Sequence, residues 1–203
     1  MENKKVKIAV LVSGGGTNLQ ALIDAQTAGI INSGEISLVI SNVQGAYALT
    51  RAKNANIDTA LFLKKNFANA AEFETAIINC LEENEIDLIV LAGFMCILSE
   101  NFTKKYANRI LNVHPSLIPS FCGKGFYGLH VHEAALEYGV KVSGATVHFV
   151  NEIPDGGKII MQKAVDILED DTAETLQKRI MEQAEWKILP QATEMVCCDL
   201  IKN

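Results

Sequence analysis

An asparagine and a histidine stand two residues apart in segment 112–119, and Pro115 follows the histidine directly. Side chains two residues apart on an extended strand share a face, so Asn112 and His114 would point an amide and an imidazole at one place. Proline removes a backbone donor and ends a strand, which puts the pair at a strand end before a loop. Enzymes with parallel sheets place reactive groups there, although turns also use such residues only to satisfy backbone groups.

A second candidate site is the glycine-rich segment 13–18, which follows an apolar run at 8–12 and precedes apolar residues at helical spacing. The backbone N–H groups of such a turn and the positive end of the helix dipole bind phosphate. The residues expected at the anion are Gly15, Gly16, Thr17 and Asn18. The alternative is a structural turn in which Thr17 or Asn18 caps the helix.

The acidic residue that accompanies a glycine-rich turn in dinucleotide-binding sites is missing from this sequence. Dinucleotide-binding folds carry an acidic residue about 20 residues later, at the end of the second strand. Here the predicted second strand, 35–40, is followed by Ser41 and Asn42. The sequence therefore favours a site for one phosphate group over a nicotinamide site.

An apolar loop at 92–98 follows the predicted buried strand 87–91. A flat aromatic ligand can lie on such a loop at the carboxyl end of a strand, but ordinary core packing is an equal alternative. Asp155 lies between Pro154 and two glycines, where turn chemistry alone also explains it. His130 and His132 have ligand-like spacing, but no further ligands complete a set, so we expect no metal.

Strand and helix patterns alternate along the chain and predict an α/β fold, a doubly wound and mostly parallel sheet with helices on both faces. The strands are expected at 8–12, 35–40, 58–63, 87–91, 110–113, 142–150 and 158–164. The helices are expected after 17, at 46–55, around 73–81, at 99–106, at 133–138 and after 171. A capping box at 171–174 would open the last helix, and Pro190 would end it.

The composition indicates one globular domain over residues 1–203, with 49% hydrophobic and 21% charged residues. A net charge of −6 gives no basic field for nucleic acid. Five cysteines without CxxC spacing favour free thiols in the cytoplasm. No segment looks like a signal peptide or a membrane span, so we expect small-molecule partners and no membrane partner.

The segments 13–18, 92–95 and 112–119, together with 148–150 and 155–157, resemble in order and spacing the phosphoribosylglycinamide formyltransferase family. The resemblance covers essentially the whole chain and implies the formyltransferase fold, with a Rossmann-like N-terminal half. It implies transfer of a formyl group from the co-substrate 10-formyltetrahydrofolate to the amino group of glycinamide ribonucleotide, in purine biosynthesis. The amine would attack directly through a tetrahedral intermediate, in a monomer or a homodimer without a metal.

The resemblance also implies roles for individual residues. The catalytic residues would be Asn112, His114 and Asp155, with the first two donating to the oxyanion and the acid tuning the imidazole and relaying a proton. The ribonucleotide would contact Gly15, Gly16, Thr17, Asn18 and Glu185. The folate would border Met95, Cys96, Ile97, Leu98 and Asn112.

The chain departs from the family pattern at three places. The family often has arginine where Cys96 stands and another arginine in segment 69–72, and both bear on the folate tail. Trp186 replaces a frequent histidine. The alternative functions are a formyltetrahydrofolate hydrolase, which would carry an added N-terminal domain, and a nucleotide sensor or oxidoreductase, which Ser41 and Asn42 disfavour.

Overall fold

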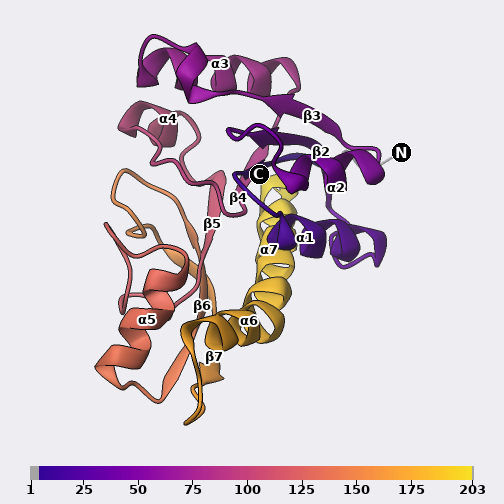
Figure 1. Cartoon of the computed structure of the whole chain (residues 1–203). Helices are drawn as coiled ribbons and strands as arrows, with labels where there is room; N and C mark the ends of the chain where they lie inside the picture. The colour runs from indigo at the N-terminus through magenta and orange to yellow at the C-terminus, as the bar shows by residue number, and fades with distance from the viewer. Residues whose placement is uncertain (1–4, 203) are drawn as a thin grey trace.

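The computed structural model describes residues 5–202 and contains a seven-stranded sheet of order β3-β2-β1-β4-β5-β6-β7 (Figure 1). Its first five strands are parallel, whereas β6 and β7 run antiparallel to their neighbours. The strands are β1 Val6–Val12, β2 Gly34–Ser41, β3 Asp58–Leu61, β4 Leu88–Leu91, β5 Ile110–His114, β6 Val142–Phe149 and β7 Ile159–Asp166. The mostly parallel α/β sheet predicted from the sequence is confirmed.

Helices cover both faces of the sheet. They are α1 Thr17–Thr27, α2 Tyr47–Asn54, α3 Ala70–Glu83, α4 Glu100–Lys105, α5 Leu129–Tyr138, α6 Ala173–Ile180 and α7 Trp186–Lys202, with a 3₁₀ turn at Lys64–Asn66 and a π turn at Met181–Glu185. Ile8 and Val10 of β1 pack with α1 and α7, whereas Ala9 and Leu11 pack with α3 and α4. The continuous apolar run in β1 therefore fits a strand buried on both sides. None of the helices within 5–202 is long and apolar enough to cross a membrane.

The strand order reverses direction between β1 and β4, because β2 and β3 lie on one side of β1 and β5 lies beyond β4. At such a reversal the carboxyl ends of parallel strands leave a crevice that binds ligands. The turn 13–18, Asn42, the loop 92–98 and Pro115 all follow carboxyl ends of these strands. The sheet thus brings four segments that are distant in the sequence to one edge.

The prediction that Pro190 ends the last helix is wrong, because α7 continues through it to Lys202. A proline ring collides with the carbonyl four residues before it, which here belongs to Trp186. Trp186 directly follows the π turn and has a ψ of −8°, far from the value of about −42° in a regular helix. This rotation tilts the carbonyl away, and the ring of Pro190 is buried in the core.

Several smaller boundaries also differ from the prediction, and the largest difference is at α5, which begins at Leu129, four residues before the expected start at 133. The capping box of α6 joins Thr172 and Thr175, one residue later than expected, because the Asp171 carboxylate instead pairs with Arg179. Strand β3 ends at Leu61, two residues early, where a short connection leads into the 3₁₀ turn.

Candidate active site

Strands β5 and β6 lie side by side in the sheet (Figure 1). Four polar side chains converge at this place. Asn112 Nδ2 lies 3.2 Å from His148 Nε2. The Asp155 carboxylate lies 3.5 Å from His114 Nδ1 through one oxygen and 3.5 Å from His148 Nε2 through the other. The structure therefore brings together the three residues predicted as catalytic, Asn112, His114 and Asp155, and adds His148.

His148 enters the cluster through strand register. In the antiparallel pairing of β5 and β6, Asn112 stands directly opposite His148, and His114 stands opposite Thr146. Directly opposed residues on neighbouring strands bring their side chains together. The alternating pattern of strand 142–150 predicted that His148 and Thr146 lie on one face of the strand. It did not predict that this strand pairs with β5, which is what places His148 opposite Asn112.

The turn that carries Asp155 has a backbone suited to its position. Asp155 has a φ of 56°, in the left-handed region that aspartate tolerates better than most residues. At Gly157 an added Cβ would lie 1.7 Å from the carbonyl oxygen of Phe149, so only glycine fits where the turn folds over the strand end. The N–H of Gly123 donates to Asp155 Oδ2 at 2.8 Å and holds the carboxylate toward the histidines.

The hydrogen bonds assign protons to the two imidazoles. His148 Nδ1 lies 2.7 Å from the carbonyl oxygen of Phe149, so this nitrogen donates, and Nε2 accepts from Asn112. His114 Nε2 donates in the same way to the carbonyl of Phe121 at 2.8 Å. The nitrogen of His114 that remains free to gain or lose a proton is Nδ1, which faces Asp155.

Burial sets the charges in this cluster. Burial lowers the pKa of His114, and the Asp155 charge and the Phe121 carbonyl only partly oppose it. Burial alone would raise the pKa of Asp155, but His148 and His114, when their imidazoles are protonated, together with the N–H of Gly123 hold it below its ordinary value. Near neutral pH the site therefore holds a neutral imidazole beside an ionised carboxylate, which is the arrangement of a general base.

The glycine-rich turn leads directly into α1. Gly16 has a φ of 72° and approaches α2 so closely that an added Cβ would lie 2.6 Å from the Cβ of Ala48. Gly16 occupies the cap position and no side chain caps the helix, so the alternative in which Thr17 or Asn18 is the cap is wrong. At Gly15 an added Cβ would meet no atom within 4 Å, so this residue borders open space where an anion can approach.

Asn18 and Glu185 lie together, as their shared predicted role requires. Asn18 Nδ2 donates to Glu185 Oε2 at 2.7 Å, while Asn18 Oδ1 is buried and has no hydrogen-bond partner among residues 5–202. Glu185 ends the π turn and is only 6% exposed. Burial raises the pKa of Glu185 to about 7, although the hydrogen bond from Asn18 acts in the opposite direction. A buried acid with so perturbed a pKa is typical of a ligand-binding position.

The residues of the loop 92–98 differ in their exposure. Met95 and Ile97 are 60% and 77% exposed, so these apolar side chains are accessible to a ligand. Leu98 is buried in the core between α3 and α4, as the alternative interpretation of this loop expected. Cys96 is half-buried and accepts a hydrogen bond from Asn42.

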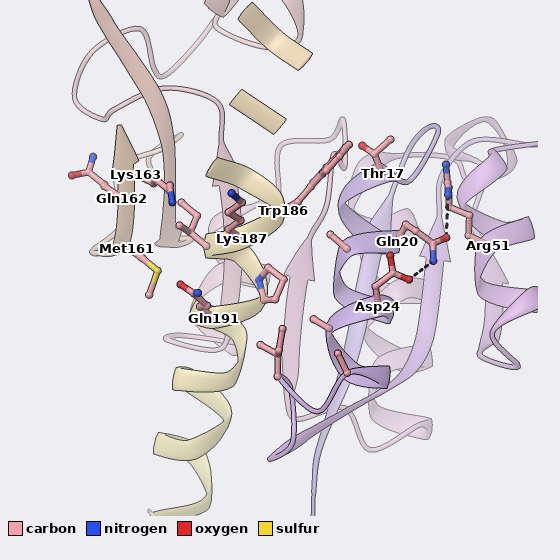
Figure 2. Close-up of a pocket in the computed structure, with 16 residues that line it drawn as sticks. Thr17, Gln20, Asp24, Arg51, Met161, Gln162, Lys163, Trp186, Lys187 and Gln191 are labelled. Carbon is pink, nitrogen blue, oxygen red and sulfur yellow. Dashed lines mark hydrogen bonds between the residues drawn. The ribbon is translucent and has the colours of Figure 1, made fainter. Parts of the chain in front are cut away.

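A cavity of about 730 Å³ lies between α1, α7 and β7 (Figure 2). Figure 2 shows the Trp186 side chain between α7 and α1, and Gln20 of α1 pointing toward Asp24 and Arg51. Thr17 lines the cavity and is also one of the predicted ribonucleotide contacts. The cavity therefore adjoins the phosphate turn but contains none of the residues of the four-residue cluster.

The two histidines of α5 do not form a metal site with each other. His130 is exposed and bonds to Glu133, whereas His132 is buried, and within the described part of the chain neither of its ring nitrogens has a hydrogen-bond partner. Burial lowers the pKa of His132 to about 4, with a further contribution from the charge of His114. Across residues 5–202, no group of three or more His, Cys, Asp or Glu side chains is arranged to hold a metal ion.

Residues 6–193 match the formyl transferase family. The chain belongs to this family. Over 184 residues it is 49% identical to phosphoribosylglycinamide formyltransferase of Haemophilus influenzae, covering 91% of this chain and 84% of that protein. It is 46% identical over 201 residues to the human trifunctional purine biosynthetic protein adenosine-3, covering 99% of this chain but only 19% of the human protein.

Solved structures agree with the sequence comparison. Glycinamide ribonucleotide transformylase 1 from Symbiobacterium toebii superimposes with a TM-score of 0.90 at 38% identity, covering 98% of this chain and 94% of that one. Phosphoribosylglycinamide formyltransferase from Brucella melitensis gives a TM-score of 0.87 at 41% identity, with 96% of each chain covered. This formyl transferase family member is an enzyme that transfers formyl groups, and its expected family and fold are confirmed.

The raised pKa of Glu185 predicts a pH-dependent gain in stability for Glu185→Gln, which keeps an oxygen that can accept from Asn18. Because the pKa rises from 4.5 to about 7 on folding, the folded protein holds a proton here that the unfolded chain has lost. The free energy of unfolding of the wild type therefore falls as pH rises through this range. We expect the variant to gain up to about 3 kcal/mol over wild type at pH 8, and little near pH 4.

Urea unfolding at the two pH values measures this difference. Glu182→Gln, in the same π turn but with a more exposed side chain, is the matched control and should change little between them. A gain for Glu185→Gln that is the same at both pH values would contradict a raised pKa.

Proposed function

We propose that this enzyme transfers a formyl group from 10-formyltetrahydrofolate to the amino group of glycinamide ribonucleotide, a step of purine biosynthesis. The observation that carries the proposal is the cluster of Asn112, His114, His148 and Asp155 at the sheet edge that also carries the glycine-rich turn. The names of the relatives from Haemophilus influenzae and Symbiobacterium toebii support the same acceptor.

The chemistry needs an oxyanion donor and a proton route. When the amine attacks the formyl carbon, a new N–C bond forms and the carbonyl oxygen becomes an oxyanion, before the bond to the folate nitrogen breaks. Asn112 Nδ2 gives one N–H to His148, which leaves its second N–H for the oxyanion. His114 Nδ1, which lies 3.5 Å from the Asp155 carboxylate, takes the proton that the amine loses and returns it to the departing folate nitrogen, and the carboxylate stabilises the imidazolium in between.

The remaining predicted residues bind the two substrates in this proposal. Gly15, Gly16, Thr17 and Asn18 hold the 5′-phosphate at the start of α1, and Glu185 accepts from donor groups of the ribonucleotide. Met95, Cys96, Ile97 and Leu98 border the folate, with the first and third most open to it. The enzyme would act in the cytoplasm without a metal, as a single-domain monomer or homodimer on small molecules.

The absorbance change of 10-formyltetrahydrofolate, followed with and without glycinamide ribonucleotide, tests the proposal. We expect deformylation only when the ribonucleotide is present, because the cluster needs an amine to attack. Deformylation without the ribonucleotide would contradict the transferase and identify a hydrolase. No deformylation under either condition would contradict both.

Asp155→Asn should reduce kcat by a factor on the order of 10² or more, because it removes the carboxylate that assists proton transfer at His114. Asparagine tolerates the left-handed φ of 56° about as well as aspartate, so the turn should persist. The dissociation constant of the ribonucleotide should change by less than about threefold. Asp58→Asn, an exposed change at the start of β3, is the control, and unchanged turnover in Asp155→Asn would refute the assignment.

Asn18→Ala should weaken ribonucleotide binding by about tenfold while leaving folate affinity nearly unchanged, because the lost amide belongs to the phosphate turn. Trp186 is the single tryptophan and follows Glu185 directly, so its fluorescence can report the titration. Thr17→Ala provides a second test, and Thr27→Ala at the other end of α1 is the control. An effect confined to folate affinity would contradict the phosphate assignment.

A further inference from the structure

Ser13, the first residue after β1, joins three strand ends through hydrogen bonds. Its N–H donates to the carbonyl of Gly93 at 3.1 Å, and its hydroxyl accepts from the N–H of Met95 at 2.7 Å. The same hydroxyl donates to Asn42 Oδ1 at 2.6 Å. Asn42 Nδ2 then donates to the sulfur of Cys96 at 3.1 Å. We call this set of contacts the Ser13–Asn42 bridge.

The bridge connects the two loops to which the proposed function gives different ligands. Ser13 directly precedes the glycines of the turn 13–18, and its partners Met95 and Cys96 belong to the loop 92–98. Gly93, with a φ of 76°, gives the second loop a backbone that few other residues adopt. The sheet fixes only the first residue of each of these two glycine-containing loops. The side chains of Ser13 and Asn42 connect the loops beyond that point.

Asn42 stands where the acidic residue of a dinucleotide site is expected, yet both ends of its amide have partners inside the protein. Its oxygen accepts from Ser13 and its nitrogen donates to Cys96, and an aspartate could supply only the first of these contacts. The end of β2 therefore positions the two loops. Only an amide at residue 42 can both accept from Ser13 and donate to Cys96, because a carboxylate has no N–H.

We propose that Ser13 and Asn42 are positioning residues that couple the two substrate sites, so that a ligand on either loop favours the loop conformation that binds the other ligand. This inference rests on the proposed function, because it takes the turn 13–18 as the phosphate site and the loop 92–98 as the folate site. The bridge is the physical connection, since a shift of Ser13 moves the hydroxyl that holds both Asn42 and the N–H of Met95.

Coupling between two sites is reciprocal, which makes the proposal measurable from either side. Calorimetry of glycinamide ribonucleotide binding, with and without saturating tetrahydrofolate, gives the coupling as a ratio of dissociation constants. For the wild type we expect a ratio of about ten, within the usual range for coupled sites. Titration of tetrahydrofolate with and without the ribonucleotide should give the same ratio.

Asn42→Ala should reduce this ratio to about one while each ligand still binds alone, because the bridge is cut without removing a ligand contact. Ser13→Thr, which keeps a hydroxyl for Asn42 and for the N–H of Met95, should retain coupling that Ser13→Ala loses. A general loss of stability would not distinguish these two variants in this way. Asn84→Ala is the matched control, because Asn84 Nδ2 also contacts a cysteine, Cys80, but at the end of α3.

A ratio that stays near ten in Asn42→Ala would overturn the proposal, and so would a wild-type ratio of one. Either result would leave the proposed function intact, because both ligands would still bind to the wild type. Failure of either ligand to bind to the wild type on its own would instead contradict the proposed function, and the coupling inference would fall with it.

Discussion

The packing of one carboxylate between two imidazoles, in a space almost closed to water, is the constraint on which the site depends. Each oxygen of Asp155 faces one histidine at 3.5 Å, and the side chains of His114 and His148 are 5% and 2% exposed. Removing a carboxylate from water is unfavourable unless hydrogen bonds and nearby charges compensate. The N–H of Gly123, 2.8 Å from Asp155 Oδ2, supplies part of that compensation.

The sheet topology supplies the second requirement, which is that groups from distant segments meet. The reversal of strand order between β1 and β4 places the glycine turn and the loop 92–98 at one edge, and the antiparallel pairing of β5 with β6 adds His148. Glu185 reaches the same region from the π turn, where burial keeps its acid partly protonated at neutral pH. A buried carboxyl group with a raised pKa lowers the stability of the folded protein at neutral pH. Such groups are typical of ligand-binding sites.

The sequence predicted those features that depend on short segments. The apolar run before the glycines identified β1, and the spacing of Asn112 and His114 before a proline predicted a strand end with both groups on one face. The role of His148 depends on register between strands, which no single segment contains. The continuation of α7 through Pro190 depends on the rotated carbonyl of Trp186, and the contacts of Asn42 depend on three strand ends meeting.

The most direct test of this account is a crystal structure with glycinamide ribonucleotide and tetrahydrofolate both bound. The account predicts the 5′-phosphate on the N–H groups of the turn 13–18, the folate ring against Met95 and Ile97, and the amine of the ribonucleotide within hydrogen-bond reach of His114 Nδ1 or Asn112. Binding of either molecule wholly within the cavity between α1, α7 and β7, which is lined by none of Asn112, His114, His148 and Asp155, would contradict it.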